Sequence, residues 1–317
     1  MDEFEIIRQY FDRESADENV LVGIGDDGAV TRPSAGRDLV TVIDTIVSGV
    51  HFPSDLSPAD IGYRAVAVNL SDMAAMAATP RWMTLALTLN RAEPSWLEGF
   101  AQGLFSAADE YDVILIGGDT TRGNDVVVTV QLTGEVDAGA MLLRSGASAS
   151  DSIYVTGTIG DAMAGLSVLQ SGTPQDDDSI YLVNRFARPK ARVCAARNIA
   201  HFASAAIDLS DGLFTDIGKL LMASGVSGRI ELNRIPLSPQ LRRTMATDDA
   251  LRAALGGGDD YELCFTTAAT EDVVYKVSRQ SGVAMTCIGV VESGAGLRCT
   301  LDGKQFDYHD EGYLHFR

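Results

Sequence analysis

Residues 58–78 read PADIGYRAVAVNLSDMAAMAA. The apolar residues of this segment recur at helical spacing, a proline occupies the first turn, and Ser57 stands where a helix N-cap is expected. Apolar runs of strand length lie on both sides, at residues 39–43 and 83–89. A helix between two strands indicates a mixed α/β domain.

The same alternation continues along the chain in two sets. In the first half the pattern predicts further strands at 20–24, 113–116 and 126–132 and a second helix at 94–111. In the second half it predicts strands at 153–155, 205–207, 229–232, 261–266, 285–291 and 297–300, and helices at 161–170, 211–224 and 271–280. The polar, small-residue stretch SGASASD after Arg144 is typical of a boundary. We therefore expect two domains, residues 1–145 and 146–317.

Composition narrows the class of protein. The chain has 317 residues, 46% of them hydrophobic and 22% charged, which is enough to build a substantial core and excludes general disorder. The 44 Asp and Glu residues outnumber the 25 Lys and Arg residues, giving a formal charge of -19 at pH 7. This excess of negative charge argues against a nucleic acid or an anionic membrane as partner.

The location of the protein follows from what the sequence lacks. No apolar run approaches the roughly 20 residues of a membrane span, and the first residues, MDEFEIIRQYFDRES, are acidic where a signal peptide is basic. The cysteines form no CxxC pair and lie in largely apolar segments; they are Cys194, Cys264, Cys287 and Cys299. Buried thiols are favoured over a zinc site or disulfides. We expect a cytoplasmic protein.

Acidic residues recur at the ends of predicted strands, where α/β proteins bind ligands. Several of them are flanked by glycine; the positions are Asp26, Asp27, Asp44, Asp119, Asp208, Asp211, Asp259 and Asp260. Each alone is ordinary turn or helix-cap chemistry, but together they favour a shared metal or polyanion centre. The run 176–178, by contrast, is expected to be a solvated loop.

Asp72 is the most informative single acid. It falls in the helical stripe formed by Ile61, Ala65, Val68 and Ala75, so it is expected on the face that packs against the core. An unpaired buried carboxylate is costly, and it needs a metal, a cation or a backbone donor. A metal ligand and a backbone-bonded carboxylate both remain open at this point.

Carboxylates without clustered His or Cys favour Mg²⁺ together with substrate phosphates. Gly117-Gly118-Asp119 after a strand is a candidate phosphate-binding turn, and a plain turn is the alternative. No GxxxxGK[ST] loop, protein-kinase motif set or GxSxG elbow is present. The glycine spacing of residues 157–162 does not match a dinucleotide fingerprint, and a helix-starting turn is predicted there.

Eight ordered motifs resemble those of the thiamine-monophosphate kinase family over nearly the whole chain. They are GIGDDGAV (23–30), IDTIVSGVHF (43–52), AVNLSDMAAM (67–76), LIGGDTTRG (115–123), RSGA (144–147), IYVTGTIGDA (153–162), AIDLSDGL (206–213) and GGDDYELCF (257–265). The family shares its two-domain fold with aminoimidazole ribonucleotide synthetase and selenophosphate synthetase. The resemblance implies that fold, with the N-terminal domains of a homodimer pairing across a central β-barrel and a C-terminal α/β domain.

The implied activity is the ATP-dependent, Mg²⁺-dependent phosphorylation of thiamine monophosphate to thiamine diphosphate, the final step in making that cofactor. By similarity the Mg²⁺ ligands would be Asp27, Asp44, Asp72, Asp119, Asp208 and Asp211. ATP would contact Gly118, Asp119, Arg144 and Ser210. His51, Asp259 and Tyr313 would lie at the thiamine monophosphate. No residue is assigned as a general base, because the acceptor is a phosphate oxygen already anionic at pH 7 and the ions bring the two anions into line.

The chain departs from the family pattern in two places. Val42-Ile43 precede Asp44 where the family usually has hydroxyl residues, and Asp259 stands where Glu is frequent. His51 is alternatively a strand-end histidine bonded to backbone, and Tyr313 a packed terminal aromatic. A related synthetase with another acceptor and a non-catalytic Mg²⁺ or Ca²⁺ protein are the competing functions, although a pure cation site gives no reason for Gly117-Gly118 or Arg144.

Overall fold

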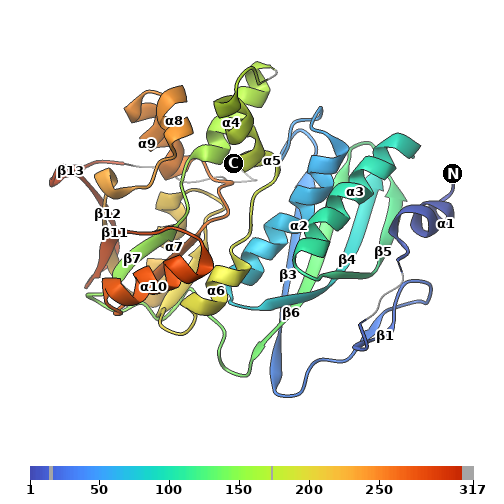
Figure 1. Cartoon of the computed structure of the whole chain (residues 1–317), viewed down its shortest axis with the longest axis horizontal. Coiled ribbons are helices and arrows are strands. Elements are labelled where there is room, and N and C mark those ends of the chain that lie inside the picture. Colours follow the sequence, from blue (N-terminus) through green and yellow to red (C-terminus); the bar gives the residue numbers. More distant parts are fainter. Residues whose placement is uncertain (14–16, 173, 309–317) are drawn as a thin grey trace. The chain divides into compact units, whose positions relative to one another are not determined.

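The computed structural model describes residues 1–13, 17–172 and 174–308. Its contacts divide the chain into two compact units, which we call the first unit (Met1–Met73 with Ala78–Gly139) and the second unit (Ala74–Ala77 with the chain from Ala140 onward). Both units combine helices with a sheet, so the predicted mixed α/β class is confirmed (Figure 1). None of the helices in these residues has the length and apolar character needed to span a membrane.

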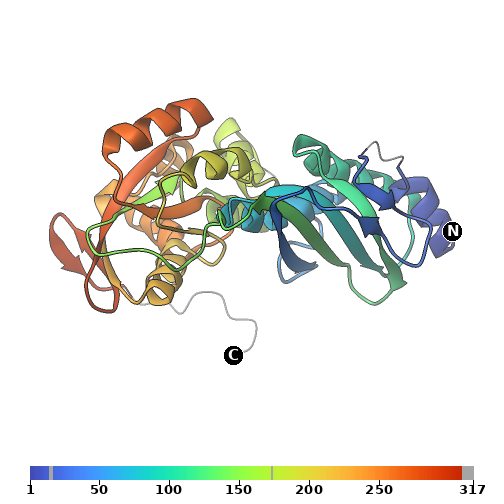
Figure 2. The same ribbon diagram turned by 90° about the horizontal axis from the view of Figure 1, so that it is seen from below.

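The first unit is a four-stranded sheet with two helices on one face (Figure 2). In spatial order the strands are β3 (Arg37–Val47), β6 (Val127–Asp137), β4 (Thr79–Leu89) and β5 (Ile114–Arg122). The helices are α2 (Pro58–Ala75) and α3 (Pro94–Glu110). Ahead of them come α1 (Glu3–Ile6), the π-helical turn η1 (Ile7–Phe11) and a small ribbon of β1 (Val20–Val22) and β2 (Val30–Thr31). The predicted strand at 20–24 is therefore shorter than expected.

Local sequence sets where α2 begins, and glycine sets how closely it packs. Ser57 Oγ accepts the backbone N–H of Asp60 at 3.1 Å, which confirms the predicted cap. A Cβ added at Gly62 would lie 2.2 Å from a backbone oxygen of α3, and one added at Gly103 would lie 1.8 Å from a backbone oxygen of α2. The two helices are thus in backbone contact, which only residues without a Cβ permit.

The alternation of β3 defines two faces of this sheet. Val40 and Ile46 are buried on the face that α2 and α3 cover. Leu39 and Ile43 point the other way and are 51% and 64% exposed. We call this second side the outer face; it carries large apolar side chains that no described element of the first unit covers.

The second unit contains a seven-stranded sheet that is antiparallel except for one pair. In spatial order the strands are β13 (Lys304–Phe306), β12 (Gly296–Leu301), β9 (Ser227–Glu231), β11 (Met285–Glu292), β7 (Ser152–Thr156), β10 (Leu263–Thr267) and β8 (Ala205–Asp208). Only β9 and β12 run parallel among these neighbouring strands. All of them except the short β13 were predicted within a few residues.

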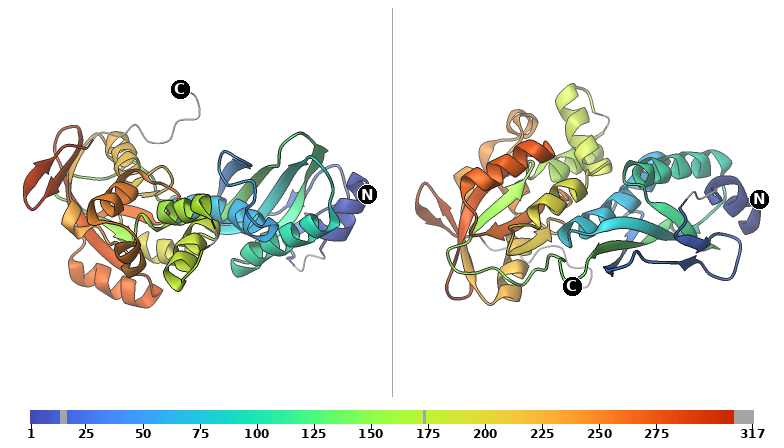
Figure 3. Two further views of the ribbon diagram at one scale, coloured as in Figure 1. Left: turned by 90° about the horizontal axis from the view of Figure 1, so that it is seen from above. Right: turned by 60° about the horizontal axis from the view of Figure 1, so that its bottom comes forward.

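Helices cover both faces of this sheet. They are α4 (Asp161–Ser171), α5 (Asp177–Ala187), α6 (Val193–Ile199), α7 (Leu213–Ser224), the 3-10 turn η2 (Leu232–Arg234), α8 (Pro239–Thr244), α9 (Thr247–Gly256) and α10 (Glu271–Ser281). Helix α7 packs against β8 and β12, and α6 lies beside α10 (Figure 3). Ile153 and Val155 face the core cluster that includes α7, whereas Tyr154 between them stacks on Phe265.

Two expectations need correction here. The run 176–178 is exposed or partly exposed but is not a loop: Asp176 Oδ1 accepts the N–H of Ser179 at 2.8 Å and caps α5. Aspartate is as suitable for a helix cap as for a solvated loop, and composition alone does not separate them. All four cysteines are unpaired; Cys264 and Cys299 are buried as expected, but Cys194 is exposed, because it lies on the solvent side of helix α6, which the sequence pattern did not predict.

Candidate active site

In the second unit, two acidic segments from distant parts of the sequence lie side by side. Strand β8 ends at Asp208, and its antiparallel partner β10 begins opposite that residue. Beyond the strands, the backbone N–H of Asp259 donates to the oxygen of Ser210 at 2.8 Å, and that of Tyr261 to Leu209 at 2.9 Å. Because the strands are antiparallel, the end of one meets the start of the other. The two acidic segments therefore converge because β8 and β10 are antiparallel neighbours, and not because parallel strands end at one edge of a sheet.

The loop before β10 has a backbone that most residues avoid. Gly258 has φ +67°, and a Cβ there would lie 2.5 Å from the backbone oxygen of Ser210. Asp259 and Tyr261 also have positive φ, at 61° and 50°. Non-glycine residues adopt this left-handed conformation only where surrounding contacts hold them in it. The Tyr261 hydroxyl donates to Asp259 Oδ1 at 3.1 Å, so the two strained residues support each other.

Asp211 has a basic neighbour that sequence reasoning missed. The Lys219 ammonium on α7 bonds to the Asp211 carboxylate and, at 2.8 Å, to Asp216 Oδ1. Asp216 Oδ2 accepts the N–H groups of Ser210 at 3.0 Å and Asp211 at 2.9 Å. Burial raises the pKa of Asp216 despite the hydrogen bond from Lys219. The spacing of Asp216 and Lys219, three residues apart on one helix, was the signal that could have revealed this cluster.

Arg144 lies elsewhere in the second unit. Its carbonyl oxygen accepts a hydrogen bond from Ser224 Oγ at 3.0 Å, and the same hydroxyl accepts the N–H of Gly146 at 3.2 Å. Ser224 is the last residue of α7, whereas Asp211 precedes its first turn. A helix of this length spans about 18 Å. The backbone of Arg144 is therefore at the opposite end of α7 from Asp211.

In the first unit a cavity of about 540 Å³ collects a second group of predicted residues. The loop 23–29, residues 115–120, Thr84, Leu85 and the apolar side chains of Phe4, Ile7 and Phe11 line it. Asp27, Gly118 and Asp119 are thus brought to one hollow. A Cβ on Gly118 would lie 2.0 Å from the backbone oxygen of Leu85, so the strand pairing itself requires glycine at this position.

Two predicted metal ligands of the first unit lie on opposite faces of its sheet. Read across the strands from β3 to β5, Asp44 shares a row with Gly118, and Thr45 shares the next row with Asp119. Paired residues point to the same side, so Asp44 faces the helices and Asp119 faces outward with the exposed Thr45. Asp44 on β3 and Asp119 on β5 are also three strand spacings apart across the sheet, which is about 14 Å. One chain does not bring both carboxylates to one ion.

The other predicted residues have mixed outcomes. His51 Nδ1 accepts the N–H of Val47 at 3.1 Å, which fits the backbone-bonded alternative for that nitrogen. Asp72 is partly exposed, whereas Ser71 and Met73 beside it are fully buried. The expectation that Asp72 shares the buried face is therefore wrong, because α2 is buried on nearly every side before this point and opens at Asp72. Tyr313 lies outside the described residues.

Comparisons with known proteins identify the family to which the chain is similar. The family model described as AIR synthase related protein, N-terminal domain, matches residues 25–136, and the one described as AIR synthase related protein, C-terminal domain, matches residues 148–302. The thiamine-monophosphate kinase of Salmonella typhimurium strain LT2 is 45% identical over 319 residues, covering 99% of this chain and 98% of the relative.

Solved structures give the same assignment. The crystal structure of thiamine-monophosphate kinase from Stenotrophomonas maltophilia K279a has a TM-score of 0.86 and 41% identity over 95% of each chain. A structure described as AaThiL complexed with AMPPCP and TMP has a TM-score of 0.79 and 32% identity over 92% of each chain. Fold, motifs and full-length similarity therefore agree that this chain belongs to the thiamine-monophosphate kinase family.

Proposed function

We propose that this chain transfers a phosphoryl group from ATP to the phosphate of thiamine monophosphate, by direct in-line displacement, in the final step that makes thiamine diphosphate. The observation that carries the proposal is the joining of the 208–211 turn to the loop that ends at Tyr261, which concentrates carboxylates and hydroxyls at one end of the sheet. A relative whose structure holds AMPPCP and TMP supports the choice of substrates.

The side chains of this site serve to bind and orient. The acceptor oxygen belongs to a phosphate that is already ionised near neutral pH, so no group has to remove a proton from it. Asp259 and His51, with Tyr313, would contact the thiamine phosphate. Gly118 and Ser210 would approach the ATP phosphates with backbone and hydroxyl groups, and Arg144 would pair with their charge. Alignment of donor and acceptor then supplies most of the rate.

Mg²⁺ fits the donor chemistry of the proposed ligands, which are all carboxylates. They are Asp27, Asp44, Asp72, Asp119, Asp208 and Asp211. Within the described ranges no three His, Cys, Asp or Glu side chains are arranged to hold a metal by themselves. This agrees with the habit of Mg²⁺ to bind one or two carboxylates and to complete its shell with phosphate oxygens and water. When bound, the ions would neutralise the charge of both phosphates.

The outer face of the first unit supports a homodimer in which two such sheets pair as a barrel. Leu39 and Ile43 would be covered by a second copy. The opposite orientations of Asp44 and Asp119 further suggest that one copy supplies Asp119 to a site of the other. Mixing inactive Asp44→Asn and Asp119→Asn chains should restore about a quarter or more of the activity if the site is shared, and none if it is not.

Residues 1–145 would form the nucleotide-binding and dimerisation domain and residues 146–317 the C-terminal domain. Because ATP is a cytoplasmic metabolite, the enzyme would act in the cytoplasm, without nucleic acid or membrane partners.

The test is incubation with thiamine monophosphate, ATP and MgCl₂, followed by chromatography for thiamine diphosphate and ADP. Wild type should form both in equal amounts, Asp72→Asn little, and the control Asp109→Asn as much as wild type, because Asp109 on α3 pairs with Arg13 on the surface. Mg²⁺-dependent ATP binding without diphosphate would move the acceptor to the substrate of a related synthetase. No nucleotide binding at all would refute the proposed site.

A further inference from the structure

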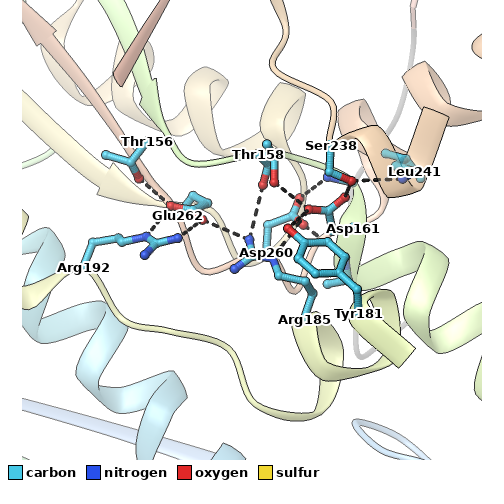
Figure 4. Close-up of polar contacts among 12 residues, drawn as sticks. Thr156, Thr158, Asp161, Tyr181, Arg185, Arg192, Ser238, Leu241, Asp260 and Glu262 are labelled. Carbon is cyan, nitrogen blue, oxygen red and sulfur yellow. Dashed lines mark hydrogen bonds and ion pairs between the residues drawn. The ribbon is translucent and has the colours of Figure 1, made fainter. Parts of the chain in front are cut away.

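Behind the Asp259–Tyr261 loop lies a buried group of charged side chains, shown in Figure 4. Successive residues of the loop point alternately to two sides. Asp259 and Tyr261 are partly exposed, whereas Asp260 and Glu262 are 3% and 0% exposed and face inward. The proposed function uses Asp259 of the outward pair and gives no role to Asp260 or Glu262.

Asp260 fastens the loop to the start of helix α4. Its Oδ2 accepts the backbone N–H of Gly160 at 2.7 Å, and its Oδ1 that of Ala162 at 3.3 Å. Gly160 is the N-cap residue of α4, so the carboxylate also meets the positive end of the helix dipole. Burial raises the pKa of Asp260 to about 7, while the Arg185 guanidinium opposes that shift.

Glu262 fastens the other end of the loop. It accepts Thr156 Oγ1 at 2.6 Å, Arg185 Nη2 at 2.9 Å and Arg192 Nε at 2.6 Å. Arg185 also reaches Asp161 on α4, with Nε 3.6 Å from Oδ2. Burial raises the pKa of Glu262, but Arg192 and Arg185 outweigh this effect and hold that pKa below its usual range. Two anchored carboxylates thus bracket Tyr261, and one of them adjoins Asp259.

We propose that Asp260 is a positioning residue for the acceptor substrate, which holds Asp259 and Tyr261 in their left-handed conformation so that the Asp259 carboxylate meets thiamine monophosphate. The inference rests on the proposed function, because Asp259 is the proposed contact. Non-glycine residues at positive φ, such as Asp259 and Tyr261 on either side of Asp260, relax towards ordinary conformations unless surrounding contacts prevent it. Relaxation would move Asp259 while leaving the cavity of the first unit unchanged.

The test is Asp260→Asn, which keeps the shape but presents an amide to the N–H groups of Gly160 or Ala162. Its control is Asp151→Asn. Asp151 is a buried aspartate of the same unit, directly before the first residue of β7, and it accepts hydrogen bonds from Ser148 N at 3.0 Å and Ser204 Oγ at 2.5 Å. In Asp260→Asn the KM for thiamine monophosphate should rise by about tenfold or more, with the KM for ATP within about twofold. The control should lose melting temperature without this split.

A folded Asp260→Asn enzyme with both KM values unchanged, or with both raised together as stability falls, would overturn the proposal. If that variant does not fold, Arg185→Lys should give the same split to a smaller degree, and an unchanged ratio of the two KM values would count against the idea.

A readout that needs no turnover separates this inference from the proposed function. The N–H groups of Asp259 and Tyr261 should exchange with deuterium faster in Asp260→Asn than in wild type or Asp151→Asn. If wild type makes no thiamine diphosphate, the proposed function fails, and faster exchange would still support Asp260 as the anchor of the loop. Unchanged exchange would refute the anchoring role.

Discussion

Replacing Glu262 by Gln should cost this protein far more stability than the same change at Glu292. Each glutamate bridges two arginines: Glu262 bonds Arg185 and Arg192 inside the second unit, and Glu292 bonds Arg229 and Arg298 nearer its surface. The Glu262 side chain is fully buried, whereas that of Glu292 is 27% exposed and its partners more so.

The magnitude follows from that difference in burial. Removing one partner of a buried ion pair leaves charge uncompensated and costs about 3–5 kcal/mol. A solvent-exposed pair is worth about 0–1 kcal/mol. We therefore expect Glu262→Gln to lose about 3 kcal/mol more unfolding free energy than Glu292→Gln.

Urea denaturation measures both variants against wild type. Far-UV circular dichroism should be the signal, because both tryptophans, Trp82 and Trp96, belong to the first unit and their fluorescence does not report directly on the second. The early loss in Glu262→Gln should appear in circular dichroism before tryptophan fluorescence changes. Equal urea midpoints for the two variants would show that the buried network does not carry the stability assigned to it here.

Two further predictions concern pH and helix packing. Burial raises the pKa of Asp260 from 3.8 to about 7, although the Arg185 guanidinium opposes the shift. The stability that this carboxyl contributes is therefore fully present below about pH 4 and is lost as pH rises through about 7. The stability of wild type relative to Asp260→Asn, measured in urea, should fall over that range. Gly103→Ala should destabilise by about 1–3 kcal/mol, since its Cβ would meet α2 backbone at 1.8 Å. Gly218→Ala, with nothing within 4 Å, should be neutral or stabilising by about 0.4–1 kcal/mol in the same melts.

Local signals predicted the elements that depend on neighbouring residues. Ser57 caps α2 through a hydrogen bond to a residue only three positions away, and this local contact fixes where the helix begins. Gly160 is the N-cap residue of α4, as the turn pattern indicated. The helices that the sequence pattern did not predict are α5, α6, α8 and α9. Some of them are short, and others carry aspartate or proline in the first turn, which suits a loop equally well. Their existence depends on what they pack against.

The candidate site likewise has features that short motifs predicted and features that only the tertiary structure determined. The motifs by themselves identified the family and the acids of the site, because those residues are recognisable one segment at a time. Tertiary structure alone joined Ser210 to Asp259, set Lys219 against Asp211 and turned Asp44 and Asp119 to opposite faces. Strand register and the burial of charge depend on contacts between segments up to a hundred residues apart, as between Gly160 and Asp260, and no local pattern of residues encodes such a pairing.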